Sequence, residues 1–248
     1  MEKFKKAYRN YSLLLKTVPS LVMTLFVVSV ILMNIVANKE ISTGISWLAL
    51  DCGVTLSWLS FLCMDMLTKR FGAKASIQLS LTAMIINLAV CGMLFLISNI
   101  PGNWGQFYTY GDVANNALNA TVGGTWYVVL GSACAFAASA IVNALLNVFA
   151  GKLCKKDNFA SYAFRSYLST LIAQFIDNFI FAFMVSHVFF GWSMLQVITC
   201  SFTGCIVELL CEVIFSPIGY KVCKKWEREN VGSVYLAKVA VDEVLEEI

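Results

Sequence analysis

Residues 166–187 read SYLSTLIAQFIDNFIFAFMVSH, and this stretch decides the fold class. It is apolar over most of its length and carries Gln174, Asp177 and Asn178 at its centre. An apolar run of about 20 residues is long enough to cross the roughly 30 Å hydrocarbon core of a bilayer as an α-helix. The stretch therefore predicts a membrane-spanning helix with polar side chains deep within it.

The composition of the whole chain agrees with a membrane protein. Of its 248 residues, 59% are hydrophobic and 13% are charged, whereas soluble domains are about 45 to 50% apolar and about 25% charged. The mean hydropathy of +0.74 is too high for a water-facing domain, which still exposes a large area. Three prolines and 15 glycines, with no periodic or low-complexity tract, exclude the fibrous and disordered classes.

Six apolar runs of this length predict an all-α, polytopic membrane protein with six transmembrane helices. We expect the spans at residues 18–37, 44–67, 75–98, 125–150, 166–187 and 193–217. Residues 1–17 then form a basic N-terminal segment, residues 18–220 the transmembrane domain and residues 221–248 a tail. The first run is long and follows a basic segment, which favours a permanent helix over a cleaved signal peptide.

The lysines and arginines predict the orientation, because short cytoplasmic loops are enriched in both. Of the 18 basic residues, Lys39 alone falls on the opposite side from the others, which lie in the N-terminal segment, the second and fourth loops and the tail. Both termini should therefore be cytoplasmic. The segment 99–124 has no basic residue and several aromatic ones, so we expect an external lid there.

Five acids fall inside the expected spans, and no lysine or arginine does: the acids are Asp51, Asp65, Asp177, Glu208 and Glu212. A carboxylate at membrane depth is costly unless it faces the bundle interior, finds a partner or takes up a proton. Asp177 lies at mid-span and ranks first, while Glu208 and Glu212 share one helix face. An ion pair with Lys69 explains Asp65 equally well, and Asp51 would lie at the external mouth with Lys39 as partner.

Amide side chains follow the same distribution, at Asn34, Asn38, Asn87, Asn143, Asn147, Gln174 and Asn178. Amides commonly join membrane helices by hydrogen bonds, so some of these will be structural. Gln174, Asp177 and Asn178 form the densest group, because their spacing places them close together on one helix. Donors and acceptors gathered in an otherwise apolar pocket are typical of a site for a planar, hydrogen-bonding solute.

Other kinds of site have little support in the sequence. The single histidine, His187, does not support a histidine metal site or a Ser-His-Asp triad, and there is no GxxxxGK[ST] phosphate loop. We expect no catalytic residue, no metal, no cofactor and no nucleic-acid partner. Small residues at Gly131, Ala135 and Ser139 favour close packing within the bundle, and a homodimer seam is the alternative.

Four groups of residues resemble the queuosine precursor transporter family, also called the vitamin uptake transporter family. They are NIVANK at 34–39, DMLTKRFG at 65–72, RSYLST at 165–170 followed by Gln174 and Asp177, and Glu212 with Ser216, Pro217 and Tyr220. The resemblance covers about residues 18–230. It implies a six-helix importer of 7-deazaguanines in the bacterial inner membrane, with a bundle similar to the substrate-binding subunits of energy-coupling-factor transporters.

The chain departs from the family pattern at four positions. Many members have an acid where Lys69 stands, although a basic residue also occurs there in the family. The family pattern has an arginine at Tyr127, an acid at Asn143 and a lysine at Glu208. The last change reverses a charge deep in the bundle. An additional acid there would suit the cationic aminomethyl form of the precursor.

A deazaguanine presents adjacent N–H donors, which one carboxylate accepts together, and a carbonyl that an amide serves. Asp177 or Glu208 would accept from the donors, and Gln174 or Asn178 would serve the carbonyl. The ring would lie against an aromatic side chain such as Phe179, Trp58 or Trp126. The full set of candidate substrate-binding residues is Asp177, Gln174, Asn178, Glu208, Glu212, Asp65, Asn34, Asn38 and Asn143.

Import of a precursor such as preQ0, preQ1 or queuine, by alternating access around a site near the membrane midplane, is the leading hypothesis. The sequence leaves open whether protons, bound at Asp177, Glu208 or Glu212, or an ATP-driven partner supply the energy. The first alternative is uptake of another vitamin or nucleobase-like solute. An integral-membrane enzyme or a scaffold fits less well.

Overall fold

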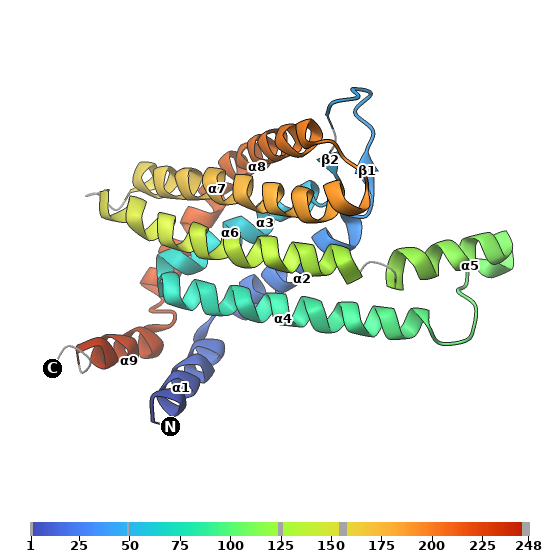
Figure 1. Cartoon of the computed structure of the whole chain (residues 1–248). Coiled ribbons are helices and arrows are strands. Elements are labelled where there is room, and N and C mark those ends of the chain that lie inside the picture. The colour runs from blue at the N-terminus through green and yellow to red at the C-terminus, as the bar shows by residue number, and fades with distance from the viewer. Residues whose placement is uncertain (1, 49, 124–125, 154–157, 245–248) are drawn as a thin grey trace.

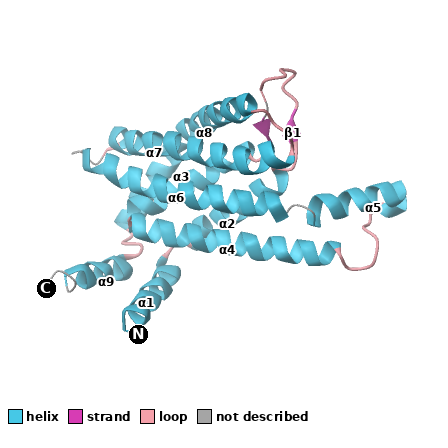
Figure 2. Cartoon of the chain, in the orientation of Figure 1, coloured by secondary structure: helices cyan, strands magenta, loops and turns pink. Residues whose placement is uncertain are grey.

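The computed structural model describes residues 2–48, 50–123, 126–153 and 158–244, and most of them are helical (Figure 2). In chain order the elements are α1 (Glu2–Thr17), α2 (Ser20–Val36), β1 (Glu40–Ile41), β2 (Leu50–Asp51), α3 (Val54–Phe71), α4 (Ala73–Ser98), α5 (Phe107–Gly123), α6 (Trp126–Leu153), α7 (Phe159–Phe181), the π-helical turn η1 (Ala182–His187), α8 (Met194–Arg228) and α9 (Ser233–Val244). Helices α2, α3, α4, α6, α7 and α8 pack side by side in one bundle (Figure 1).

The bundle is apolar on its outer surface and partly polar inside. Ile85 on α4 and Ile214 on α8 are 62% and 67% exposed, whereas Gln174, Glu212 and Asp65 are fully buried. In water this distribution would be unfavourable, because large apolar patches would face the solvent. It is the distribution expected where lipid surrounds the helices.

Four segments in the described part of the chain are long and apolar enough to cross a membrane: α4, α5 together with α6, α7 with η1, and α8. Helices α1 and α2 give a fifth if they count as one broken span, since they are bent by 102°. Helix α3 packs against α2 and α8 within the bundle but carries Asp65, Lys69 and Arg70. The chain is therefore a multi-pass membrane protein with an all-α bundle.

The predicted start of the second span, at residue 44, is wrong. Strand β1 pairs antiparallel with β2 in a short hairpin, and α3 begins only at Val54. Gly44 adopts a φ of 72°, a turn conformation that favours glycine, and the Thr43 hydroxyl donates to the Leu48 carbonyl at 2.8 Å. Asp51 consequently lies in a strand, outside the helices of the bundle.

Helix α8 does not end at Pro217, the predicted end of the last span, but continues to Arg228. Proline has no N–H, so the carbonyl of Val213 loses its usual helical donor. The hydroxyl of Ser216 donates to this carbonyl at 3.3 Å and replaces the missing bond. Glu212 thus lies well inside α8 rather than near its end. The other spans begin within a few residues of the prediction, except that α7 starts earlier, at Phe159.

The two terminal helices lie together at the end of the bundle opposite α5 and the hairpin (Figure 1). Asn10 of α1 donates to Asp242 of α9 at 2.6 Å. The expected external segment contains α5, and the expected tail contains α9. Residue 124 of the first segment and residues 245–248 of the second lie outside the described residues. The predicted start of the fourth span, at residue 125, lies outside them as well. Gly131 packs against Val185 of η1, so the small residues of α6 serve packing within the bundle.

Candidate functional site

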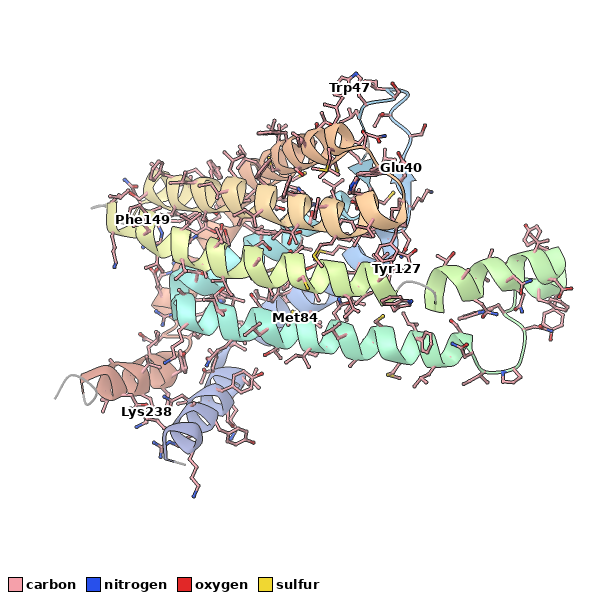
Figure 3. The ribbon with its side chains drawn as sticks, viewed as in Figure 1. Glu40, Trp47, Met84, Tyr127, Phe149 and Lys238 are labelled. Atoms are coloured by element: carbon pink, nitrogen blue, oxygen red, sulfur yellow. The ribbon has the colours of Figure 1, made fainter. Side chains whose placement is uncertain are left out.

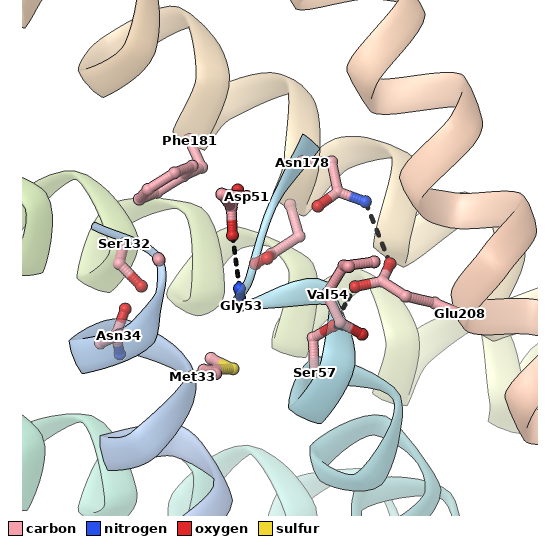
Figure 4. A pocket seen from close by; sticks show the side chains of 12 residues that line it. Met33, Asn34, Asp51, Gly53, Val54, Ser57, Ser132, Asn178, Phe181 and Glu208 are labelled. Carbon is pink, nitrogen blue, oxygen red and sulfur yellow. Dashed lines mark hydrogen bonds between the residues drawn. The ribbon is translucent and has the colours of Figure 1, made fainter. Parts of the chain in front are cut away.

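A small cavity lies inside the bundle, where α2, α3, α6, α7 and α8 meet strand β2 (Figure 4). Its volume is about 30 Å³, which is room for one or two water molecules. Of the residues predicted to bind substrate, Asp177, Asn178, Glu208 and Asn34 line it. The remaining lining residues are Met33, Ala37, Asp51, Gly53, Val54, Ser57, Ser132 and Phe181.

Glu208 of α8 is 1% exposed and accepts hydrogen bonds on both oxygens (Figure 4). The Ser57 hydroxyl of α3 donates to Oε1, and Asn178 Nδ2 of α7 donates to Oε2 at 3.0 Å. The Gln174 amide also faces this carboxylate; with its nitrogen turned inward it donates to Oε1 at 3.1 Å and to Oε2. Each of these partners is an uncharged donor.

Gly204 allows Asn178 to reach Glu208. A Cβ at position 204 would lie 2.7 Å from Asn178 Nδ2, which is too close for two atoms that are not bonded. Only glycine lets the α8 backbone approach the amide this closely. The contact between α7 and α8 at this level therefore depends on a missing side chain.

Two further acids border the cavity. Asp177 Oδ1 accepts from the Ser139 hydroxyl of α6 at 2.7 Å, and Asp51 Oδ1 accepts from the Gly53 amide at 2.7 Å. Burial raises the pKa of Asp51 to about 6, although the Gly53 hydrogen bond opposes the increase. Within the described residues Asp51 has no ion pair, so the predicted pair with Lys39 is absent. Asp51, Asp177 and Glu208 make the cavity acidic.

Asp65, Glu212 and Asn143 lie in a second cluster, nearer α9. Asp65 Oδ1 accepts from Asn143 at 2.8 Å and Asn147 at 3.0 Å. Its Oδ2 accepts from Thr170 at 3.3 Å and contacts Ser166, which also contacts Glu212 Oε1. The alternative of an ion pair between Asp65 and Lys69 is wrong, because Lys69 Nζ lies 4.0 Å from Glu227 instead. The sequence did not predict that Glu208 and Glu212 would fall into separate clusters.

Asn38 lies apart from both clusters. It lines a larger, mainly apolar cavity of about 300 Å³ between α2, α4, α5 and α6, together with Asn87 and Trp104. Asn34 lines this cavity as well as the acidic one. The two spaces are therefore neighbours on either side of one asparagine.

The aromatic residues proposed for stacking do not line the acidic cavity. Trp58 stacks on Phe215 with ring centroids 4.4 Å apart, Phe179 stacks on Phe175 and Phe183, and Trp126 is 53% exposed. Phe181 lines the cavity instead. Its position four residues after Asp177 could have revealed it, because residues at this spacing share a helix face.

Several hydroxyl groups of the site were not predicted as site residues. Ser57, Ser139 and Ser166 reach the acids from neighbouring helices, and serines occur in membrane helices for many packing reasons. Tyr127, which replaces the arginine of the family, lies at the end of α6 nearest α5 (Figure 3). Its ring stacks on that of Phe189, with the ring centroids 4.3 Å apart. It does not line the acidic cavity.

An apolar helical bundle with buried acids around an internal cavity belongs to the class of polytopic membrane proteins that have a polar site within the membrane. In the described part of the chain no group of His, Cys, Asp and Glu side chains is arranged to hold a metal ion. Residues 51–222 match the model of the family described as "Putative vitamin uptake transporter", and the chain belongs to that family. Family and architecture together indicate a transporter rather than an enzyme. No curated protein and no solved structure matches the chain.

Proposed function

We propose that this protein imports queuosine precursors, which are 7-deazaguanines such as preQ0, preQ1 or queuine, across a bacterial inner membrane. The observation that carries the proposal is the environment of Glu208. Among the described residues, this buried carboxylate has only uncharged donors as partners, from Ser57, Asn178 and Gln174, and it borders a cavity.

A deazaguanine matches this carboxylate chemically. Its ring N–H and its exocyclic amine are adjacent donors that one carboxylate accepts together. In the structure the amides of Gln174 and Asn178 take the positions that such donors would take. When a base replaces them, either amide can offer its N–H to the base carbonyl, since a side-chain amide carries both a donor and an acceptor.

The other cavity residues fit the remaining parts of such a ligand. Phe181 and Met33 provide apolar surface for the faces of the ring. Asp177 and Asp51 provide negative charge for the cationic aminomethyl group of preQ1. The neutral nitrile of preQ0 has no use for that charge, so the two ligands give a test of the site.

Binding requires the cavity to widen, because small-molecule sites are usually about 300 Å³ or larger. The neighbouring cavity of about 300 Å³ shares Asn34 with the acidic one. A displacement of α2, which carries Asn34, would join the two spaces. Movements of this kind around a central site are the basis of alternating access in membrane transporters.

The proposed topology has six spans, formed by α2, α3, α4, α6, α7 and α8, with both termini in the cytoplasm. Two observations support it: α1 and α9 lie at the same end of the bundle (Figure 1), and the basic residues of the sequence concentrate in the segments at that end. Arg70, at the end of α3, donates to the Val231 carbonyl at 2.8 Å, which fits a position outside the hydrocarbon core.

A second candidate is uptake of another vitamin or nucleobase-like solute, with this chain as the substrate-binding subunit of an ATP-driven partner. The family description favours it, because that description names vitamins in general. Deleting the genes of such partners would reduce uptake in this case and would leave it unchanged in the first.

Uptake of labelled preQ0, preQ1 and queuine into cells that cannot synthesise queuosine tests the proposal. We expect the wild type to import at least one of them. Glu208→Gln should weaken binding about 100-fold, because it removes a charged acceptor of two hydrogen bonds. Asp177→Asn should reduce preQ1 uptake more than preQ0 uptake, since only preQ1 carries a positive charge near this acid.

The matched control is Glu229→Gln, which removes a charge from an exposed pair with Lys225 at the end of α8. Its uptake should equal that of the wild type. If the wild type neither imports nor binds any deazaguanine while another vitamin enters, the substrate assignment is wrong. If Glu208→Gln keeps full uptake, the site is wrong.

A further inference from the structure

The hydroxyl of Ser166 contacts two buried carboxyl groups at once. It lies within hydrogen-bond distance of Asp65 Oδ2 on α3 and of Glu212 Oε1 on α8. A hydroxyl has one proton to donate. It can donate to one of the two carboxyl groups only, so the other contact needs a proton on the carboxyl side.

The hydrogen bonds around the two acids indicate which one holds that proton. Asp65 accepts from Asn143, Asn147 and Thr170 in addition to Ser166, which are the donors that an ionised carboxylate requires. Glu212 is also fully buried, but its Oε2 has no partner. A buried ionised oxygen without a donor is far costlier than a neutral one. The proton therefore belongs to Glu212, which donates to Ser166, which in turn donates to Asp65.

Unpartnered polar atoms beside the two acids indicate a site for a small donor rather than a finished structural network. Asn143 is fully buried, its Nδ2 contacts Asp65, and its Oδ1 has no partner. The Tyr162 hydroxyl, one helical turn before Ser166 and 2% exposed, also has none. These are acceptors that a water molecule or hydronium ion could reach when the site opens.

The charged groups around the cluster are directed elsewhere. On α3, Lys69 Nζ lies 4.0 Å from Glu227 of α8 and 5.9 Å from the Tyr162 ring centroid. On α7, Arg165 donates to Asn147 Oδ1 at 2.7 Å. Helix α6 contributes uncharged amides, and the Cys223 thiol of α8 points to the Met66 carbonyl. Within the described residues neither Asp65 nor Glu212 forms an ion pair, so nothing cationic replaces the proton.

The same two helices carry the acidic cavity. Helix α7 carries Gln174 and Asn178 as well as Ser166, and α8 carries Glu208 one turn before Glu212. When a ligand displaces the amides of α7 from Glu208, α7 is free to shift relative to α8. The same shift separates Ser166 from Glu212. Two sites that bias one helix contact are coupled in free energy.

Building on the proposed function, we propose that Asp65, Ser166 and Glu212 form a proton-binding site that couples uptake to the proton gradient. Glu212 takes up one proton from one side of the membrane and becomes a neutral carboxyl group bonded to Ser166. When the Ser166 contact opens toward the other side, the proton leaves to water and Glu212 becomes a carboxylate again. No other bond forms or breaks in this step.

One experiment tests the proton itself and needs no substrate. Infrared spectra of the purified protein in lipid should show the C=O band of a protonated carboxyl group at neutral pH. Glu212→Gln should remove a component of this band that Glu208→Gln leaves in place, and Glu229→Gln is the matched control outside the bundle. If Glu212→Gln removes no component, the proton site is wrong.

A second experiment tests the coupling in proteoliposomes with labelled preQ1, using counterflow and gradient-driven uptake side by side. Glu212→Gln should retain counterflow but lose gradient-driven accumulation by at least about tenfold. Accumulation by the wild type that follows sodium, or that survives a protonophore, overturns the coupling. If the wild type shows no counterflow with any deazaguanine, the proposed function has failed, and the infrared result still decides the proton site.

Discussion

Glu208 and Glu212 lie one helical turn apart on α8, but their surroundings differ. Glu208 borders a cavity, and two of its partners are amides, which can exchange donor and acceptor roles. Glu212 borders no described cavity and shares one hydroxyl with Asp65, whose four donors come from α6 and α7. The first arrangement suits an exchange of partners with a ligand, and the second suits the uptake and release of one proton.

Helix α8 can therefore contribute one acid to a ligand site and another to a contact between helices. A buried acid that must bind a ligand needs partners that can leave without being stranded, and Gln174 and Asn178 meet this condition at the cavity. A buried acid that joins helices needs every acceptor filled, because each unsatisfied group costs stability. Asp65 meets the second condition, so it should contribute far more to folding than the acids of the cavity.

Removing the side chains of Asp65 and Asp177 in turn is the strongest test of this contrast between an acid that joins helices and an acid of the cavity. Asp65→Ala removes the acceptor shared by four donors, leaves those of Asn143 and Thr170 without a described acceptor, and should destabilise the protein by about 4 kcal/mol. Asp177→Ala removes one hydrogen bond from the Ser139 hydroxyl, which still donates to the Phe136 carbonyl at 3.2 Å, and should cost about 1 kcal/mol. Thermal unfolding of the purified variants in detergent measures both, and equal losses would contradict the contrast.

Gly204→Ala tests whether the cavity amides really depend on close contact between α7 and α8. The new Cβ would lie 2.7 Å from Asn178 Nδ2 and should push the amide away from Glu208. The displaced amide can then no longer donate to the base carbonyl, and loss of that hydrogen bond corresponds to roughly tenfold weaker binding. Equilibrium binding of labelled preQ1 to the purified protein measures this.

Gly92→Ala is the matched control, because nothing lies within 4 Å of a Cβ at this position on α4. It should leave binding unchanged and raise stability slightly, as alanine favours helices over glycine. Equal effects of the two substitutions would mean that the position of Asn178 does not matter for the site.

The bundle could be predicted from the sequence more completely than the contacts inside it. The runs that became α2, α4, α6, α7 and α8 are recognisable because lipid demands long apolar helices. Residues 44–53 have the same apolar character, and the turn at Gly44 made them a hairpin. The prediction could not distinguish an apolar hairpin from the start of an apolar helix, because composition does not show where the chain turns.

For the site, spacing along one helix was informative and pairing between helices was not. Gln174 and Asn178 were predicted together because their separation places them on one face, and both contact Glu208. Ser166 lies in the RSYLST group that resembles the family, but its contacts with Asp65 and Glu212 could not be predicted, since they form only where α3 and α8 meet α7. The ion pair considered for Asp65 with Lys69 is absent for the same reason: two other helices, α6 and α7, provide the hydrogen-bond donors of Asp65.

Asp242 in α9 differs from the acids inside the bundle, because it has basic partners. Lys238 lies 3.1 Å and Lys6 3.6 Å from its Oδ1, and Asn10 donates to Oδ2 at 2.6 Å. These contacts, the Asn10 hydrogen bond first, hold the pKa of Asp242 below its usual value. Since the folded pKa is depressed, the charge stabilises the α1 and α9 contact above about pH 4 and ceases to do so as the pH falls through the folded pKa.

Asp242→Asn should therefore loosen α9 at pH 7 by the smallest amount of the substitutions considered, because partly exposed ion pairs contribute little. The wild type and the variant should become alike once the pH falls below the depressed pKa of Asp242, where both side chains are neutral. Hydrogen exchange of the α9 amides measures the difference at each pH. A difference that persists in acid would mean that the shape of the side chain, rather than its charge, joins the two terminal helices.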